Sequence, residues 1–211
     1  MTDQPCGAAA IAAARDDPRR LADEIRACRL CAGRFERTAT AHEPRPILRL
    51  SAEARLLIAS QAPGARAHAS GLPFDDPSGD RLRAWMGVDR ATFYDASRIA
   101  IAPMGFCFPG YDDKGGDLPP PPICAATWRR RVLAAMPRIE STLLVGGRAL
   151  AWALGRPAKV TETVRGWRDF PDGAFPLPHP SWRNTAWMKR NPWFEDEVLP
   201  ALRAEVARRL T

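Results

Sequence analysis

The sequence predicts an α/β fold with a parallel central sheet. Four short apolar runs that suit buried strands alternate with segments of helical periodicity, which is the pattern of repeated β-α units. The expected strands are residues 55–59, 99–103, 142–146 and 174–178. Ligands of such sheets bind beyond the carboxyl ends of the strands, so polar residues at those positions are the first candidates for a site.

The expected helices begin with capping residues. Asp17 and Asp76 each precede a proline, which combines a side chain that caps a helix with a residue that suits its first turn. Asp89 is expected to cap a short helix in the same way. Further helices are expected over residues 123–136, 148–154 and 195–210, and residues 110–122 form a loop rich in Gly, Asp and Pro. The run Arg129–Arg131 is expected to lie on a solvated helix face.

The bulk composition describes an ordinary globular chain with a basic balance. The 211 residues are 45% hydrophobic and 26% charged, which is enough for one domain with a core. We expect a flexible tail over residues 1–17 and a single domain over residues 18–211. The net charge of +7 favours a polyanionic partner such as nucleic acid, although an arginine-rich protein without that partner has the same charge.

Residues 8–14 are rich in alanine but do not read as a targeting signal. They lack a preceding basic region, and acidic residues follow them directly. No apolar run approaches the roughly 20 residues that span a bilayer. We therefore expect a cytoplasmic location, where disulfides are rare.

Four of the five cysteines form a candidate metal site. Cys28 and Cys31 make a C-x-x-C pair, and Cys107 and Cys124 bracket the expected loop with sixteen residues between them. Four thiolates can hold a zinc ion or a [4Fe–4S] cluster, because soft sulfur ligands suit both. The alternative is four free, mostly buried cysteines that serve as small hydrophobic residues. Cys6 lies in the expected tail and has no assigned role.

Two loops at strand ends carry the polar residues that we expect to wall one pocket. The first, Ser60-Gln61-Ala62-Pro63-Gly64, follows the first expected strand. The second, His179-Pro180-Ser181-Trp182-Arg183-Asn184, follows the fourth. We expect Gln61 and His179 to converge on one pocket at this edge of the sheet.

These motifs together resemble the uracil-DNA glycosylase superfamily, and especially its iron–sulfur (family 4) branch. Besides the two loops, the similarity covers Gly71-Leu72-Pro73-Phe74, the following Ser78-Gly79 and the order of the four cysteines. The resemblance implies a three-layer α/β/α sandwich with a four-stranded parallel central sheet. It also implies a monofunctional hydrolase of base excision repair that acts on DNA, single strands included, containing uracil or another deaminated base. The cofactor would be a structural [4Fe–4S] cluster, with zinc as the alternative, and no obligate protein partner is evident.

The expected chemistry assigns a role to each residue of the pocket. Cleavage of an N-glycosidic bond leaves negative charge on the base, and His179 is expected to donate a hydrogen bond to it. Gln61 is expected to contact the base or hold water, and Phe74 to stack on the base. Asp75 is a less favoured candidate for orienting water. The complete set expected to bind the base or the DNA is Ala62, Pro63, Gly64, Phe74, Asp75, Ser181, Trp182, Arg183 and Asn184. The alternative for each is a structural role: a backbone-bonded histidine, a turn glutamine or a core phenylalanine.

Two departures from the family pattern leave a second hypothesis open. Ala62 stands where the best-known branch has the aspartate that positions water, and Pro103 stands where family 4 has a base-reading asparagine. A chain with these changes can also be a catalytically weak binder of uracil-containing or abasic DNA. A third and less favoured hypothesis is a redox-sensing iron–sulfur protein with this fold. Neither motif contains a lysine, so a Schiff-base lyase has no evident nucleophile.

Overall fold

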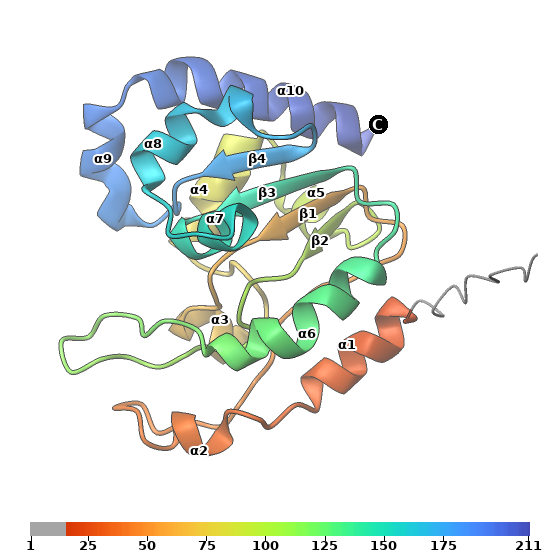
Figure 1. Ribbon diagram of the computed structural model, residues 1–211, viewed down its shortest axis with the longest axis vertical. Coiled ribbons are helices and arrows are strands. Elements are labelled where there is room, and N and C mark those ends of the chain that lie inside the picture. Colours follow the sequence, from red (N-terminus) through yellow and green to blue (C-terminus); the bar gives the residue numbers. More distant parts are fainter. Residues whose placement is uncertain (1–15) are drawn as a thin grey trace, which may run out of the picture.

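The computed structural model describes residues 16–211. They contain a four-stranded sheet in which all strands run parallel (Figure 1). The strand order is β2-β1-β3-β4, so β1 and β3 are neighbours in the sheet although β2 lies between them in the sequence. The strands are β1 (Leu56–Ala59), β2 (Ile99–Ile101), β3 (Ser141–Val145) and β4 (Ala174–Leu177). All four expected strands are thus confirmed to within two residues. Pro176 is tolerated inside β4 because β4 lies at the edge of the sheet.

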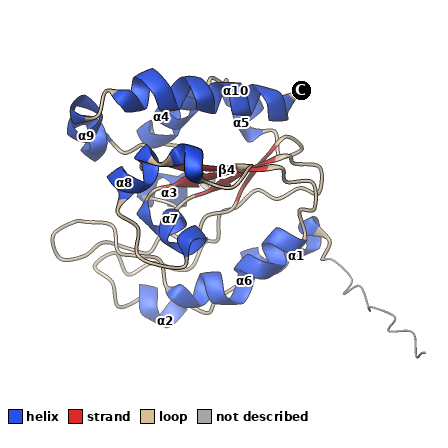
Figure 2. Cartoon of the chain, turned by 45° about the horizontal axis from the view of Figure 1, so that its top comes forward, coloured by secondary structure: helices blue, strands red, loops and turns tan. Residues whose placement is uncertain are grey.

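Helices cover both faces of the sheet (Figure 2). One face packs against α4 (Pro77–Met86), α5 (Arg90–Tyr94) and α10 (Leu199–Leu210), and the other against α1 (Pro18–Arg26) and α6 (Pro122–Ala134). The side chains of β1 alternate accordingly: Leu56 and Ile58 join the first core and Leu57 the second. The expected three-layer α/β/α sandwich is therefore confirmed.

The remaining helices border the sheet or its carboxyl edge. Only α7 (Gly147–Leu154), which packs against β3, was expected. Sequence periodicity missed four helices because each has only four to six residues: α2 (Ala32–Phe35), α3 (Ala65–Ser70), α8 (Val160–Arg165) and α9 (Thr185–Arg190). The last expected helix begins with a π-helical turn, Phe194–Val198, before α10.

The first described residues fasten the N-terminal helix to α6. Asp17 caps α1 as expected, and its Oδ1 accepts from the backbone N–H of Arg19 at 2.8 Å. The Arg131 guanidinium binds Asp16 and Glu24. Most of the tail expected over residues 1–17 lies outside the described residues. In the part that is described, no helix is long and apolar enough to cross a membrane.

One expectation about α6 is wrong. Arg129 does not lie on a solvated face: it is 3% exposed, and its Nη1 donates to the Ala102 carbonyl at 2.7 Å. Its guanidinium also stacks over the Trp152 ring. Consecutive residues of a helix point about 100° apart, so a run of three arginines cannot share one face. Arg129 is the member of the run that points inward.

Candidate active site and cysteine pocket

A cleft of about 590 Å³ opens at the carboxyl ends of the strands. Its walls come from the loops after β1 and β4, the segment before α4 and the loop of residues 110–122. It is therefore where ligands of open parallel sheets bind, and its size suits a small ligand. The predicted site residues that line it are Gln61, Ala62, Pro63, Gly64, Phe74, His179, Ser181, Trp182, Arg183 and Asn184.

Backbone hydrogen bonds fix the loop that carries Gln61. The Met104 N–H donates to the Ser60 carbonyl at 2.8 Å, and the Gly105 N–H donates to the Gln61 carbonyl at 3.0 Å. The loop after β1 is thus joined to the loop after β2, beyond the point where their strands stop pairing. Pro103, at the position of the missing asparagine, also lines the cleft and offers no side-chain polar group to a base.

His179 is held by its own loop. Its Nδ1 accepts from the Ser181 backbone N–H at 3.2 Å, and its carbonyl accepts from Asn184 Nδ2 at 2.7 Å. Because Nδ1 is the acceptor, the neutral ring carries its hydrogen on Nε2. Withdrawal of the ring from water lowers the pKa of His179, which Asp76 and Asp117 partly oppose. The imidazole is therefore a neutral hydrogen-bond donor at ordinary pH.

Close contacts from two other elements fix the position of the His179 loop. Gly146, at the end of β3, has a φ of +83°, and a Cβ there would lie 3.3 Å from the Cβ of His179. A side chain at this position would be strained and would press on the histidine. On the other side, Arg81 of α4 donates to the Ser181 carbonyl at 2.9 Å. The loop is thus tied both to the sheet and to the helix that follows Phe74.

Phe74 has a left-handed backbone, with a φ of +57°. This conformation is costly for an aromatic residue and persists only where the surroundings impose it. Gly79 of α4 is one of these surroundings: a Cβ there would lie 1.8 Å from the Phe74 carbonyl oxygen. The Tyr94 hydroxyl donates to the neighbouring Pro73 carbonyl at 2.9 Å, and the Phe93 ring meets the Phe74 ring edge-on. The glycine of the Ser-Gly pair is therefore explained by close packing against the Phe74 backbone.

The structure separates the two adjacent carboxylates. Asp75 does not line the cleft, because its Oδ1 accepts from Arg90 Nη2 at 2.9 Å; this pairing does not support the expected role in orienting water. Asp76 caps α4 as expected, with its Oδ1 accepting from the Gly79 N–H at 2.9 Å. The same carboxylate also lines the cleft, and its Oδ2 lies 3.9 Å from the position that a Cβ on Gly64 would take.

Sequence reasoning missed four ionisable residues that line the cleft: Arg66, Asp76, Tyr111 and Asp117. It assigned Asp76 to helix capping alone, although the position two residues after Phe74 was a signal for a place in the same pocket. Tyr111 and Asp117 come from the loop after β2 and form an isolated bridge with each other. No periodicity or motif marked them, since their place in the cleft depends on how the loop folds back.

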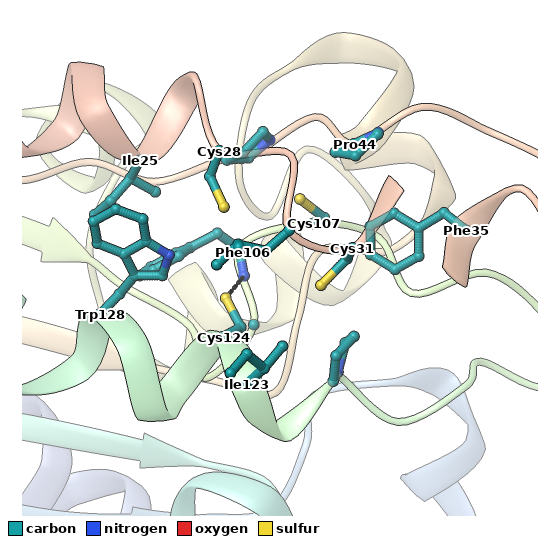
Figure 3. Close-up of a pocket in the computed structure, with 14 residues that line it drawn as sticks. Ile25, Cys28, Cys31, Phe35, Pro44, Phe106, Cys107, Ile123, Cys124 and Trp128 are labelled. Atoms are coloured by element: carbon teal, nitrogen blue, oxygen red, sulfur yellow. Dashed lines mark hydrogen bonds between the residues drawn. The ribbon is translucent and has the colours of Figure 1, made fainter. Parts of the chain in front are cut away.

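The four cysteines line a second, apolar pocket (Figure 3). Cys28 follows α1, Cys31 precedes α2, Cys107 follows β2 and Cys124 lies in α6. In Figure 3 the four sulfur atoms are arranged around a common space, toward which their side chains turn. The Phe106 backbone N–H donates to Cys124 Sγ at 3.4 Å.

The chemistry of this pocket fits a sulfur-ligated group. Four thiols line it together with apolar residues, and none of the residues that line it is a histidine or a carboxylate. Desolvation is the main reason why the pKa of Cys107 rises to about 12 and that of Cys124 to about 11. A bound cationic centre would reverse this, because coordinated thiols lose their protons.

No three His, Cys, Asp or Glu side chains in residues 16–211 are grouped to hold a single metal ion.

The comparison with protein families bears on the cleft and on part of the cysteine pocket. The model of the uracil DNA glycosylase superfamily matches residues 49–203, which include both strand-end loops, Phe74 and the last two cysteines. Cys28 and Cys31 lie outside the matched residues. The match covers most of the chain and agrees with the sheet and the position of the cleft. The chain therefore belongs to the uracil-DNA glycosylase superfamily.

Proposed function

We propose that the protein is a monofunctional DNA glycosylase that hydrolyses the N-glycosidic bond of uracil or a related deaminated base. The observation that carries this proposal is the convergence of Gln61, Phe74 and His179, from three separate segments, on one cleft. Superfamily membership supports the same class of reaction on DNA. The target base must leave the helical stack to enter such a cleft.

His179 stabilises the departing base. As the bond between C1′ and the base nitrogen breaks, its electron pair leaves with the base, which becomes anionic. The Nε2–H of neutral His179 donates to a base oxygen as that charge develops, and donors fixed in advance are the most effective in this role. The bond from Ser181 to Nδ1 keeps the ring in the tautomer that this step requires.

Asp76 supplies the carboxylate that the chain lacks at position 62, where it has Ala62. The Asp76 carboxylate is anchored through Oδ1, while Oδ2 lies 3.9 Å from the position that a Cβ on Gly64 would take. We assign to Oδ2 the orientation of the attacking water, which adds through its oxygen to C1′ and releases its proton to the carboxylate or to solvent. No lysine lines the cleft within the described residues, in keeping with water as the nucleophile.

Phe74 and Trp182 hold the DNA in place. Phe74, fixed from beneath by Gly79, offers its ring to one face of the extracted base. Trp182 is 70% exposed at the rim of the cleft, next to Arg183, whose guanidinium stacks over the indole. A large apolar ring at this place fills the gap that the extracted base leaves in the stack.

The four cysteines hold a [4Fe–4S] cluster in this proposal, as in the iron–sulfur (family 4) branch. The support is the apolar pocket that all four thiols share. The cluster, when bound, cross-links the N-terminal helices to the loop after β2 and takes no part in hydrolysis. Iron and acid-labile sulfide analysis of the protein purified without oxygen tests the assignment. Stoichiometric zinc without iron would assign the same cysteines to zinc instead.

The second candidate function is a binder of uracil-containing or abasic DNA that turns over poorly. Ala62 and Pro103 favour it, because both line the cleft at positions where the best-known branch and family 4, respectively, have polar side chains. Single-turnover assays on uracil-containing single and double strands separate the two functions. Release of uracil at enzyme excess supports the glycosylase. Retained DNA with an intact glycosidic bond, over a panel of deaminated bases, supports the binder.

A further inference from the structure

A second cavity, of about 450 Å³, lies directly beside the cleft. The two share a wall, because Gly147, His179 and Asn184 line both. The far side is formed by the start of α8 and by Trp187 of α9. We propose that this side pocket binds the base of the nucleotide next to the target in a single DNA strand, an inference that rests on the proposed function.

Trp187 is a fixed aromatic wall of the side pocket. Its Nε1–H donates to Thr161 Oγ1 at 2.7 Å, which sets the plane of the indole. Trp193 and Phe194 meet the ring edge-on, at centroid distances of 5.8 and 5.6 Å. A ring held by these contacts loses little freedom when a base stacks on it. Stacking is tolerant of base identity, since every base has a π face.

The segments that border the side pocket carry basic side chains. Lys159 and Glu162 both line the pocket, and they pair at 3.1 Å in an exposed ion pair that water screens. α9 ends in Lys189 and Arg190. These cations suit the phosphates on either side of a bound nucleotide.

Two adjacent pockets favour single-stranded DNA over duplex DNA. Neighbouring nucleotides are joined covalently. When the target base lies in the cleft, the next base is therefore close to the side pocket, which shares a wall with the cleft. That base can enter only if it also leaves the stack. In a duplex it stays stacked and paired, and extracting two adjacent bases doubles the cost of unpairing. The side pocket therefore adds affinity for single strands and little for duplexes.

The test changes the DNA as well as the protein. The probe is a fluorescein-labelled single strand with one 2′-fluorinated deoxyuridine, whose glycosidic bond resists cleavage. An abasic spacer replaces the neighbouring nucleotide on one side or the other. With the unaltered protein, one of the two spacers is expected to weaken binding about tenfold in fluorescence anisotropy. In the matching duplexes neither spacer has this effect.

Trp187→Ala should lose the same affinity as the spacer, and the spacer should then have no further effect. The matched control is Trp152→Ala, because Trp152 is 43% exposed on α7 and lines neither cavity. Equal affinities for all spacer probes would overturn the inference, even if Trp187→Ala fails to fold. The readout is equilibrium binding, so a protein that binds with this pattern but releases no uracil contradicts the proposed function alone.

Discussion

The cleft and the cysteine pocket adjoin each other, yet the residues that line them differ in polarity. Gln61 lines the cleft and Gly105 lines the cysteine pocket, and the hydrogen bond between their backbones joins the two. The cleft is open and contains carboxylates, guanidinium groups and an imidazole. The cysteine pocket offers only thiols among apolar side chains. The cleft suits a ligand that binds and is released, and the cysteine pocket suits a permanently bound group.

The two regions also differ in how their residues are held in place. In the cleft, Phe74 and Gly146 have positive φ angles, and the His179 loop is fixed by hydrogen bonds to its own backbone. In the cysteine pocket, the thiols come from the end of α1, the start of α2, the loop after β2 and α6. The cleft is therefore organised before a ligand arrives. The geometry of the cysteine pocket depends more on what the thiols bind.

The largest effect is expected from Cys124→Ser, a nearly isosteric change. It removes one of four proposed ligands and should lower the free energy of unfolding by several kcal/mol, because binding at structural metal sites can contribute about 10–16 kcal/mol. Visible absorption and iron content should fall with it. Thermal unfolding of the metal-loaded protein measures the effect, with Cys6→Ser as the control. Unchanged stability and iron content would remove Cys124 from the set of ligands.

His179→Ala should slow base release by about 10²-fold or more while leaving iron content unchanged. The reason is the loss of the Nε2–H donor at the developing charge. Single-turnover rates at saturating enzyme isolate this step from DNA binding. His42→Ala is a control histidine, since His42 packs between Phe35 and Phe108 and does not line the cleft. Equal rates for His179→Ala and the unaltered protein would reject the role.

Gly79→Ala should destabilise the protein by about 1–3 kcal/mol or more and weaken base binding, because the new Cβ displaces the Phe74 backbone. Denaturant unfolding and the affinity for free uracil measure the two effects. Gly166→Ala is the matched control, with no neighbouring atom closer than 3.4 Å to the added Cβ. If only stability changes, Phe74 does not support the base.

Asp76→Asn should slow base release by about tenfold or more with little change in stability. Asn caps a helix about as well as Asp, but it cannot accept a proton from water. Asp89→Asn is the control, because Asp89 caps α5 in the same way, accepting from the Thr92 N–H at 2.7 Å. A rate that survives Asp76→Asn would show that water is oriented by another group.

The smallest effect is expected from pH. Burial lowers the pKa of His179, so the neutral donor persists as pH falls below the ordinary histidine value of about 6.5. The rate of base release should stay flat through that value and decline only at lower pH. The unfolded chain takes up the proton first, so the free energy of unfolding should fall as pH drops below about 6.5. A rate that halves near pH 6.5 would place the imidazole in water.

Much of the cleft could be predicted because its residues follow strands or belong to compact motifs. The carboxyl ends of parallel strands meet at one edge, so Gln61 and His179 had to lie on the same side of the sheet. Asp75 and Asp76 could not be told apart in this way. Which of the two enters the cleft depends on Arg90, which is distant in sequence and binds Asp75.

Arg129 shows the same limit in the core. Its burial follows from the contact of α6 with Ala102 and Trp152, and no local pattern distinguishes it from its two neighbours. The short helices α3, α8 and α9 also escaped detection, although α8 and α9 form the side pocket. Segments of one or two turns are stabilised by packing rather than by their own periodicity.

The sequence by itself determined the alternation of strands and helices, the helix caps and the residues that meet at the sheet edge. These depend on period, propensity and local hydrogen bonds, which act over a few residues. Only the tertiary structure decided which carboxylate faces the cleft, how Phe74 is held and that Trp187 borders a second cavity. Those outcomes depend on contacts between residues far apart in the chain, where a shift of one side chain changes which group is buried and which is free to act.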